Sequence, residues 1–195
     1  HCKIRHIMEL SDAKKVLEQA KGKMHKAVEF LENELATYRV GKANPSIFSG
    51  VHIEYYGTPT PLAQVASISV PDARTMIIQP WDKSLISAIE KAIMAANLGF
   101  TPQNNGEIIR IMVPPLTEER RRELVKKART EGENARISIR NARRDGVDLL
   151  KKYQKDGLSE DIVKDTEILI QKEVDAFSKI VEEVLAAKEK EIMTV

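Results

Sequence analysis

Apolar residues recur at alternating steps of three and four along three long stretches of the chain. This spacing is typical of an amphipathic helix that buries one face. It predicts helices over about 10–38 and 117–153, the first closed by Gly41, and a third helix that starts at Ser159 after a break near Gly157. Three helices with matching apolar seams predict a three-helix bundle made from both ends of the chain.

The middle of the chain has a different pattern, with short runs of β-branched and aromatic residues broken by Gly and Pro. The runs VHIEYYG, QVASISV and RTMIIQPW predict strands, with turns at Gly57–Pro61 and Pro71–Ala73. Ser84 is placed to cap a helix over 85–97, and 107–113 is a further predicted strand. The predicted fold class is therefore α+β, a long three-helix bundle with an inserted small β/α/β domain.

We expect the bundle to comprise residues 8–41 and 115–195 and the inserted domain to comprise residues 42–114, while residues 1–7 are interpreted as a disordered or non-native terminus. Two short connections join the domains, and together they allow bending but limit twist. Glycine and proline suit a defined elbow, so we predict a hinge, with a rigid interface as the alternative. The predicted hinge residues are Val40, Gly41, Lys42, Ala43, Pro114 and Pro115.

Composition narrows the functional classes. Aromatic residues make up 5% and charged residues 31% of the 195 residues, a balance that favours long helices. The formal net charge is only +2, so affinity for nucleic acid requires local clustering of basic side chains. Cys2 is the only cysteine, which excludes a disulfide framework, and no apolar run reaches the roughly 20 residues of a membrane span. We expect a cytoplasmic protein without membrane contact.

Basic side chains gather on one side of the second long predicted helix. At about 100° of rotation per residue, this arginine face consists of Arg122, Lys126, Arg129, Arg136, Arg140, Arg143 and Arg144. Only Glu133 interrupts it, and the opposite, core-facing row is predicted to be Leu124, Ala128, Ala135, Ile139, Ala142, Leu149 and Tyr153. The planar guanidinium matches phosphate oxygens, so the face predicts a nucleic-acid surface, with a merely solvated charged face as the alternative. Gly132 lies at the edge of the core face, where we expect a close helix approach to offset its low helix propensity.

No motif of a known catalytic centre or nucleotide site is present, since the sequence lacks GxSxG, GxxxxGK[ST], GxGxxG and HExxH. His25 lies on a predicted helix without a partner four residues away, and His52 lies in a predicted strand among apolar neighbours. His1, Cys2 and His6 could ligate a metal, but they lie in the terminal segment, so neither metal nor cofactor is expected. The alternatives to a binding protein are a helical adaptor with exposed apolar residues on the arginine face, and an enzyme with titratable groups between its domains.

Three stretches together resemble the ribosome recycling factor family: EYYGTPTPL from Glu54, VPPLTEERR from Val113 and RNARRD from Arg140. RVGKANPS and EKAIMAANLG support the resemblance, which extends from about Met8 to the C-terminus with the motifs in the family's order. The resemblance implies an L-shaped molecule with a three-helix bundle and a hinged small domain. It also implies that the protein binds the large ribosomal subunit after termination and, with elongation factor G and GTP, separates the subunits and releases mRNA and tRNA.

The resemblance further implies which side chains contact ribosomal RNA, namely Arg121 in LTEERR and Arg140 and Arg143 in RNARRD, with Arg143 ranked first. Arg121 lies off the arginine face, so its role rests on the resemblance alone. The complete predicted RNA-binding set is Arg121, Arg129, Arg136, Arg140, Arg143 and Arg144. The implied partners are the large ribosomal subunit and elongation factor G with GTP, which is consumed by that factor, and we expect the chain itself to be a monomer.

Overall fold

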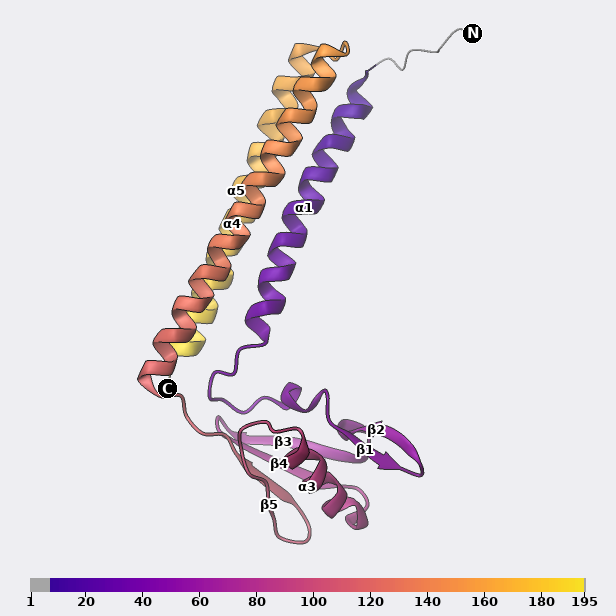
Figure 1. Cartoon of the computed structure of the whole chain (residues 1–195), viewed down its shortest axis with the longest axis vertical. Coiled ribbons are helices and arrows are strands. Elements are labelled where there is room, and N and C mark those ends of the chain that lie inside the picture. Colours follow the sequence, from indigo (N-terminus) through magenta and orange to yellow (C-terminus); the bar gives the residue numbers. More distant parts are fainter. Residues whose placement is uncertain (1–7, 195) are drawn as a thin grey trace. The chain divides into compact units, whose positions relative to one another are not determined.

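The computed structural model describes residues 8–194 (Figure 1). The segment 1–7, predicted to be a disordered or non-native terminus, lies outside the described residues, and so does the candidate metal set within it. Contacts divide the chain into two compact units. Residues up to Tyr38 together with those from Glu119 onward form the first unit, and Arg39–Glu118 form the second. Each unit buries its own set of apolar side chains.

The first unit is a bundle of three long helices, α1 (Leu10–Ala36), α4 (Glu118–Lys155) and α5 (Glu160–Met193), which run side by side in Figure 1. The predicted three-helix bundle is therefore confirmed. The buried residues of α4 are Leu124, Ala128, Gly132, Ala135, Ile139, Ala142, Gly146 and Leu150. Leu149 and Tyr153, predicted to lie in this row, are only half-buried, because steps of four carry the row through Gly146 to Leu150.

Small residues on α4 allow close packing against α5. A Cβ atom on Gly132 would overlap Cδ1 of Leu185 and lie 3.0 Å from its Cγ, and one on Gly146 would lie 3.2 Å from Cδ1 of Ile170. The close approach expected at Gly132 is thus confirmed. Gly132 itself is one of the buried residues of α4.

These two glycines give a matched pair of predictions. Gly132→Ala is expected to lower the free energy of unfolding by about 1–2 kcal/mol, because overpacking against Leu185 outweighs the gain of about 1 kcal/mol in helix propensity. Gly146→Ala is expected to change it by less than about 1 kcal/mol, because Ile170 needs to move by only a few tenths of an ångström. Urea unfolding of both variants measures the difference, and equal effects would contradict this account of the packing.

Helix α1 ends at Ala36, two residues before the predicted end near Tyr38, so Gly41 does not close it and that part of the prediction is wrong. The backbone N–H of Thr37 bonds the carbonyls of Glu34 and Leu35, and the Thr37 hydroxyl donates to the Glu34 carbonyl at 2.6 Å. A hydroxyl that satisfies a terminal carbonyl supports this early end. Tyr38 still packs on the bundle, with 8% of its surface exposed and the Lys127 Nζ 5.0 Å from its ring centroid.

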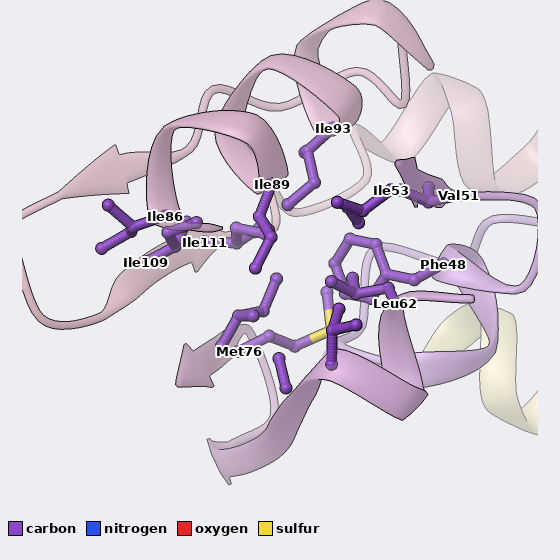
Figure 2. Packing of buried hydrophobic residues seen from close by; sticks show 13 residues of the cluster. Phe48, Val51, Ile53, Leu62, Met76, Ile86, Ile89, Ile93, Ile109 and Ile111 are labelled. Atoms are coloured by element: carbon purple, nitrogen blue, oxygen red, sulfur yellow. The ribbon is translucent and has the colours of Figure 1, made fainter. Parts of the chain in front are cut away.

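The second unit is built on a four-stranded antiparallel sheet in the order β3-β4-β6-β5, beside a separate β1–β2 hairpin. Its elements are β1 (His52–Tyr55), β2 (Thr58–Pro61), α2 (Leu62–Val65), β3 (Ala66–Asp72), β4 (Thr75–Pro80), α3 (Ile86–Ala95), β5 (Gln103–Asn104) and β6 (Ile109–Met112), with single 3-10 turns at Pro45–Phe48 and Lys83–Leu85. Figure 2 shows the core, where Ile86, Ile89 and Ile93 of α3 pack with side chains of β4 and β6. An α+β fold with a bundle and a small sheet domain is confirmed.

Three local predictions in this unit are wrong. The stretch Gly57–Pro61 is mostly strand β2, because a two-residue turn at Tyr56 and Gly57 already reverses the chain. Both prolines of β2 are tolerated because the hairpin has only two strands and each strand has a free edge. The turn after β3 falls at Ala73 and Arg74 rather than at Pro71–Ala73. Ser84 does not cap the following helix: the capping side chain is Asp82, at the start of the 3-10 turn before α3, and it accepts a hydrogen bond from the Ser84 N–H at 3.0 Å.

Candidate nucleic-acid interface

The predicted RNA-binding arginines lie on α4, whose regular backbone sets their spacing. Arg129, Arg140, Arg143 and Arg144 are exposed, as are the other two members of the arginine face, Arg122 and Lys126, whereas Arg136 is half-buried. One helix therefore presents a core row of small residues on one side and guanidinium groups on the other. This is the arrangement that the sequence predicts.

Arg129 is engaged by α5. Its Nε donates to Oε1 of Glu189 at 2.7 Å and its Nη2 donates to Oε2 at 3.4 Å. The hydrogen bonds from Arg129 and the negative charge of Glu189 raise the pKa of the guanidinium. Because this fork is bidentate, a phosphate has to compete with Glu189 for Arg129.

Glu133 contacts two more of the arginines. Its carboxylate lies 3.5 Å from Nη1 of Arg136 and 3.5 Å from Nη1 of Arg140. Both ion pairs are long, and the pair with Arg140 is exposed to solvent, so they contribute little to stability. Another anion, such as a phosphate, can replace Glu133 in them. Glu133 therefore holds these two guanidinium groups near each other without occupying them fully.

Arg143 and Arg144 differ from the other arginines of this face. Within residues 8–194 no ion pair of either is found, and the neighbouring Asp145 is paired with Lys23 of α1 at 3.6 Å. Their guanidinium groups are exposed.

Arg121 stands apart from the arginine face. It is half-buried, and it lies seven residues before Ala128, so it continues the core row of α4 toward the helix start. Its Nε is buried and has no hydrogen-bond partner among the residues the structure describes. At least one donor of this side chain therefore faces the protein rather than solvent.

A hollow of about 680 Å³ lies between α4 and α5 at the edge of the arginine face. It is open to solvent and its lining mixes basic, acidic and apolar side chains, namely Arg122, Val125, Lys126, Arg129, Thr130, Glu133, Glu189 and Met193. Ile137, 44% exposed, is the large apolar side chain on α4 that fits the adaptor alternative. One exposed side chain makes only a small apolar patch on this arginine-rich helix, so it gives little support to the adaptor alternative.

The predicted hinge residues lie in the second unit, where Gly41 is close to Pro114 and Leu116. Gly41 has φ +72°, and a Cβ on it would lie 2.8 Å from the backbone N of Leu116 and 3.3 Å from the Pro114 carbonyl oxygen. The Ala43 N–H donates to the Ala73 carbonyl at 2.7 Å. The two connections are therefore closely packed at Gly41, where only a residue without a side chain fits.

Other candidate chemistry is limited. His25 does have a partner four residues away, since its Nδ1 lies 3.8 Å from Oε2 of Glu29, and the expectation of none is wrong. The described part of the chain contains no group of three His, Cys, Asp or Glu side chains that could hold a metal ion. No helix within residues 8–194 is both long and apolar enough to cross a membrane.

The sequence analysis missed Glu189, the anion that engages Arg129. Glu189 is one of many acidic residues of α5, and its contact depends on how far α5 is shifted along α4. Periodicity assigns a residue to one side of its own helix but says nothing about the level at which two helices meet. No signal in the sequence alone could have selected this pair.

Known proteins are similar to this chain over most of its length. The family model "Ribosome recycling factor" matches residues 31–193. The chain is 54% identical to a ribosome-recycling factor of Parabacteroides distasonis over 185 residues, covering 94% of this chain and 99% of that protein. It is 52% identical to that of Porphyromonas gingivalis, covering 94% of this chain and 100% of the relative.

Two solved structures are similar over nearly the whole chain. A solution structure of a ribosome recycling factor superposes with a TM-score of 0.76 at 39% identity, covering 97% of this chain and all of the other. A model of the Thermus thermophilus ribosome recycling factor, from a description of that factor and Escherichia coli elongation factor G bound to the E. coli post-termination complex, gives a TM-score of 0.60 at 43% identity. It covers 93% of this chain and 99% of that one.

Proposed function

We propose that this chain, which belongs to the ribosome recycling factor family, recycles ribosomes after translation termination. It binds the large ribosomal subunit and, with elongation factor G and GTP, splits the post-termination ribosome into subunits and releases mRNA and tRNA. The observation that carries the binding role is the arginine face of α4, which is exposed along most of its length. Its guanidinium groups match the geometry of RNA phosphates.

We propose that ribosomal RNA is contacted by Arg121, Arg129, Arg136, Arg140, Arg143 and Arg144. Arg143 and Arg144 come first in this ranking, because neither is paired within residues 8–194. Arg136 and Arg140 come next, since their contacts with Glu133 are long. Arg129 comes after these residues, because a phosphate that binds it has to displace Glu189.

The proposed mechanism is mechanical. A stiff bundle of α1, α4 and α5 is held to RNA by phosphate contacts, while the inserted domain bends on the connections around Gly41 and Pro114–Pro115. The chain performs no bond chemistry of its own and binds no nucleotide, because elongation factor G hydrolyses the GTP. It acts as a monomer in the cytoplasm.

Salt dependence tests the phosphate contacts. Each phosphate contact releases condensed counterions, so about three to five phosphate contacts among the six proposed arginines predict a slope of about −2 to −4 in a plot of log affinity against log salt. Cosedimentation with isolated large subunits across a potassium chloride series at constant Mg²⁺ measures this slope. Binding that does not change with salt would contradict phosphate recognition and favour the helical adaptor.

A further inference from the structure

The hollow beside the arginine face is built from side chains of both α4 and α5. Helix α4 contributes Arg122, Lys126 and Arg129, whose steps of four and three place them in one line along the helix. Helix α5 contributes Glu189 and Met193. The volume of about 680 Å³ lies within the range of about 300–1,000 Å³ that is typical of ligand sites. The hollow is therefore large enough for a ligand of the size of one nucleotide, and its line of cations attracts a negative charge.

The lining of the hollow also contains apolar surface and hydrogen-bond acceptors. Val125 of α4 is half-buried, and Met193 near the end of α5 is 50% exposed. The carboxylates of Glu133 and Glu189 are acceptors for the N–H groups at the edge of a nucleobase. A nucleotide matches this mixture, because it combines a flat base, N–H groups at the edge of that base and an anionic phosphate. A ligand that is only anionic, such as an acidic peptide, uses the cations but not the apolar surface.

Glu189 holds Arg129 in a fixed orientation at the wall of the hollow. Its carboxylate accepts from Nε and Nη2 of Arg129, at 2.7 Å and 3.4 Å, and so occupies one edge of the guanidinium. The Arg129 side chain is 68% exposed and that of Glu189 only 30%, so the guanidinium is the more accessible member of the pair. A carboxylate bound at the edge does not cover the flat faces of a guanidinium, and a planar ring stacks on those faces. The pair therefore makes Arg129 a poor phosphate ligand but a suitable platform for a base.

We propose that this hollow holds one unpaired nucleotide of RNA, with its base stacked on the Arg129 guanidinium beside Met193. Its phosphate is bound by Arg122 and Lys126, which are not among the six arginines proposed above. The inference rests on the proposed binding of ribosomal RNA and adds a base contact to the phosphate contacts. Unpaired bases stack on guanidinium planes as they do on aromatic rings, whereas paired bases are covered by their neighbours. Such stacking tolerates every base, so the hollow selects unpaired over paired RNA rather than a sequence.

Short oligonucleotides test the base contact without the ribosome. The full-length protein is titrated at low salt with fluorescein-labelled hexaadenylate, with a hexamer of abasic ribonucleotides that carries the same phosphates, and with hexaglutamate, and anisotropy gives the affinities. We expect hexaadenylate to bind at least about fivefold more tightly than the abasic hexamer, and hexaglutamate to bind more weakly than hexaadenylate. Equal affinity for hexaadenylate and the abasic hexamer overturns the proposal. Hexaglutamate that binds as tightly as hexaadenylate also overturns it, since the hollow would then fit an acidic protein segment.

Two variants localise the stacking to the Arg129–Glu189 pair. Arg129→Lys keeps the charge and removes the planar group, so the affinities for hexaadenylate and the abasic hexamer should come within about twofold of each other. Glu189→Gln removes the competing charge, so the abasic hexamer should bind more tightly than it binds the parent. The preference for hexaadenylate should nevertheless fall in Glu189→Gln, because an amide does not hold the guanidinium by a charge-assisted pair. Both variants should melt near the parent, since an exposed ion pair contributes little to stability.

Glu183→Gln is the matched control, because Glu183 is an exposed acidic residue of α5 that does not line the hollow. It should keep the parental preference for hexaadenylate. A parental preference in both Arg129→Lys and Glu189→Gln, or an equal fall in Glu183→Gln, would refute the site. No preference for hexaadenylate in the parent, together with salt-dependent binding to large subunits, would refute the nucleotide site alone. Binding to large subunits that does not change with salt would refute the proposed phosphate contacts, so the two failures are distinguishable.

Discussion

Replacing Arg143 with alanine is expected to weaken binding to the large ribosomal subunit by about ten- to a hundredfold, while the protein melts like the parent. Losing one charge-assisted contact to phosphate costs about 1.5–3 kcal/mol of binding free energy. The stability should change by no more than about 0.5 kcal/mol, because Arg143 is exposed and no ion pair of it occurs within residues 8–194. Cosedimentation gives the affinity, and a splitting assay with elongation factor G and GTP gives the activity.

Two controls separate geometry from charge. Arg143→Lys keeps the charge but loses the planar fork, so we expect an intermediate loss of affinity. Lys179→Ala removes an exposed cation from α5, outside the arginine face, and should leave binding within about twofold of the parent. Parental splitting rate and half-maximal concentration in Arg143→Ala would show that Arg143 has no role in binding. Unfolding of that variant would show that Arg143 is structural.

Replacing Gly41 with valine is expected to destabilise the second unit by about 3 kcal/mol and to reduce recycling activity strongly. A left-handed backbone costs a residue with a side chain about 1–2 kcal/mol, and more when it is β-branched. The new Cβ also meets the backbone N of Leu116 at 2.8 Å, which cannot move as a flexible side chain can. Amide hydrogen exchange measures the effect in both units, at Met76 and Ile111 of the sheet and at Ile139 of the bundle.

Gly50→Val provides the matched control for Gly41→Val. A Cβ on Gly50 meets no atom within 4 Å, and its φ lies outside the left-handed region. We expect exchange in Gly50→Val to resemble that of the parent, and exchange in Gly41→Val to accelerate in the sheet but not in the bundle. Equal protection in the two variants would mean that the connections do not require a glycine at position 41. A loss of bundle protection would show that Gly41 supports both units.

Paired spin labels on the two units test the hinge proposal itself. If the connections bend at Gly41, then Gly41→Val should narrow the distribution of distances between the units, measured under conditions in which the sheet of the second unit stays folded in the variant. The same distribution in the variant and the parent, together with full recycling activity, would argue against a hinge there.

The spacing of apolar residues is enough to predict the three long helices and the face of each that is buried. The apolar positions of α1, α4 and α5 recur at helical spacing, so the bundle and the arginine face opposite the core of α4 follow from local geometry. The strands β1, β3, β4 and β6 were also predictable, because β-branched runs bounded by Gly and Pro mark them. The family motifs then indicated which arginines to rank first.

Contacts between side chains of different elements depend on how the folded elements pack, and the local pattern does not predict them. The pairing of Arg129 with Glu189 and the contact of Gly132 with Leu185 both depend on the level at which α4 and α5 pack, which no periodicity records. The end of α1 at Ala36 depended on one side-chain hydrogen bond of Thr37, and strand β2 depended on a turn that tolerates Tyr56 at positive φ. Each of these outcomes depends on free-energy differences of about 1 kcal/mol between neighbouring alternatives or on contacts between distant segments. A helical seam, in contrast, is repeated over many turns, so its small preferences add up in one direction.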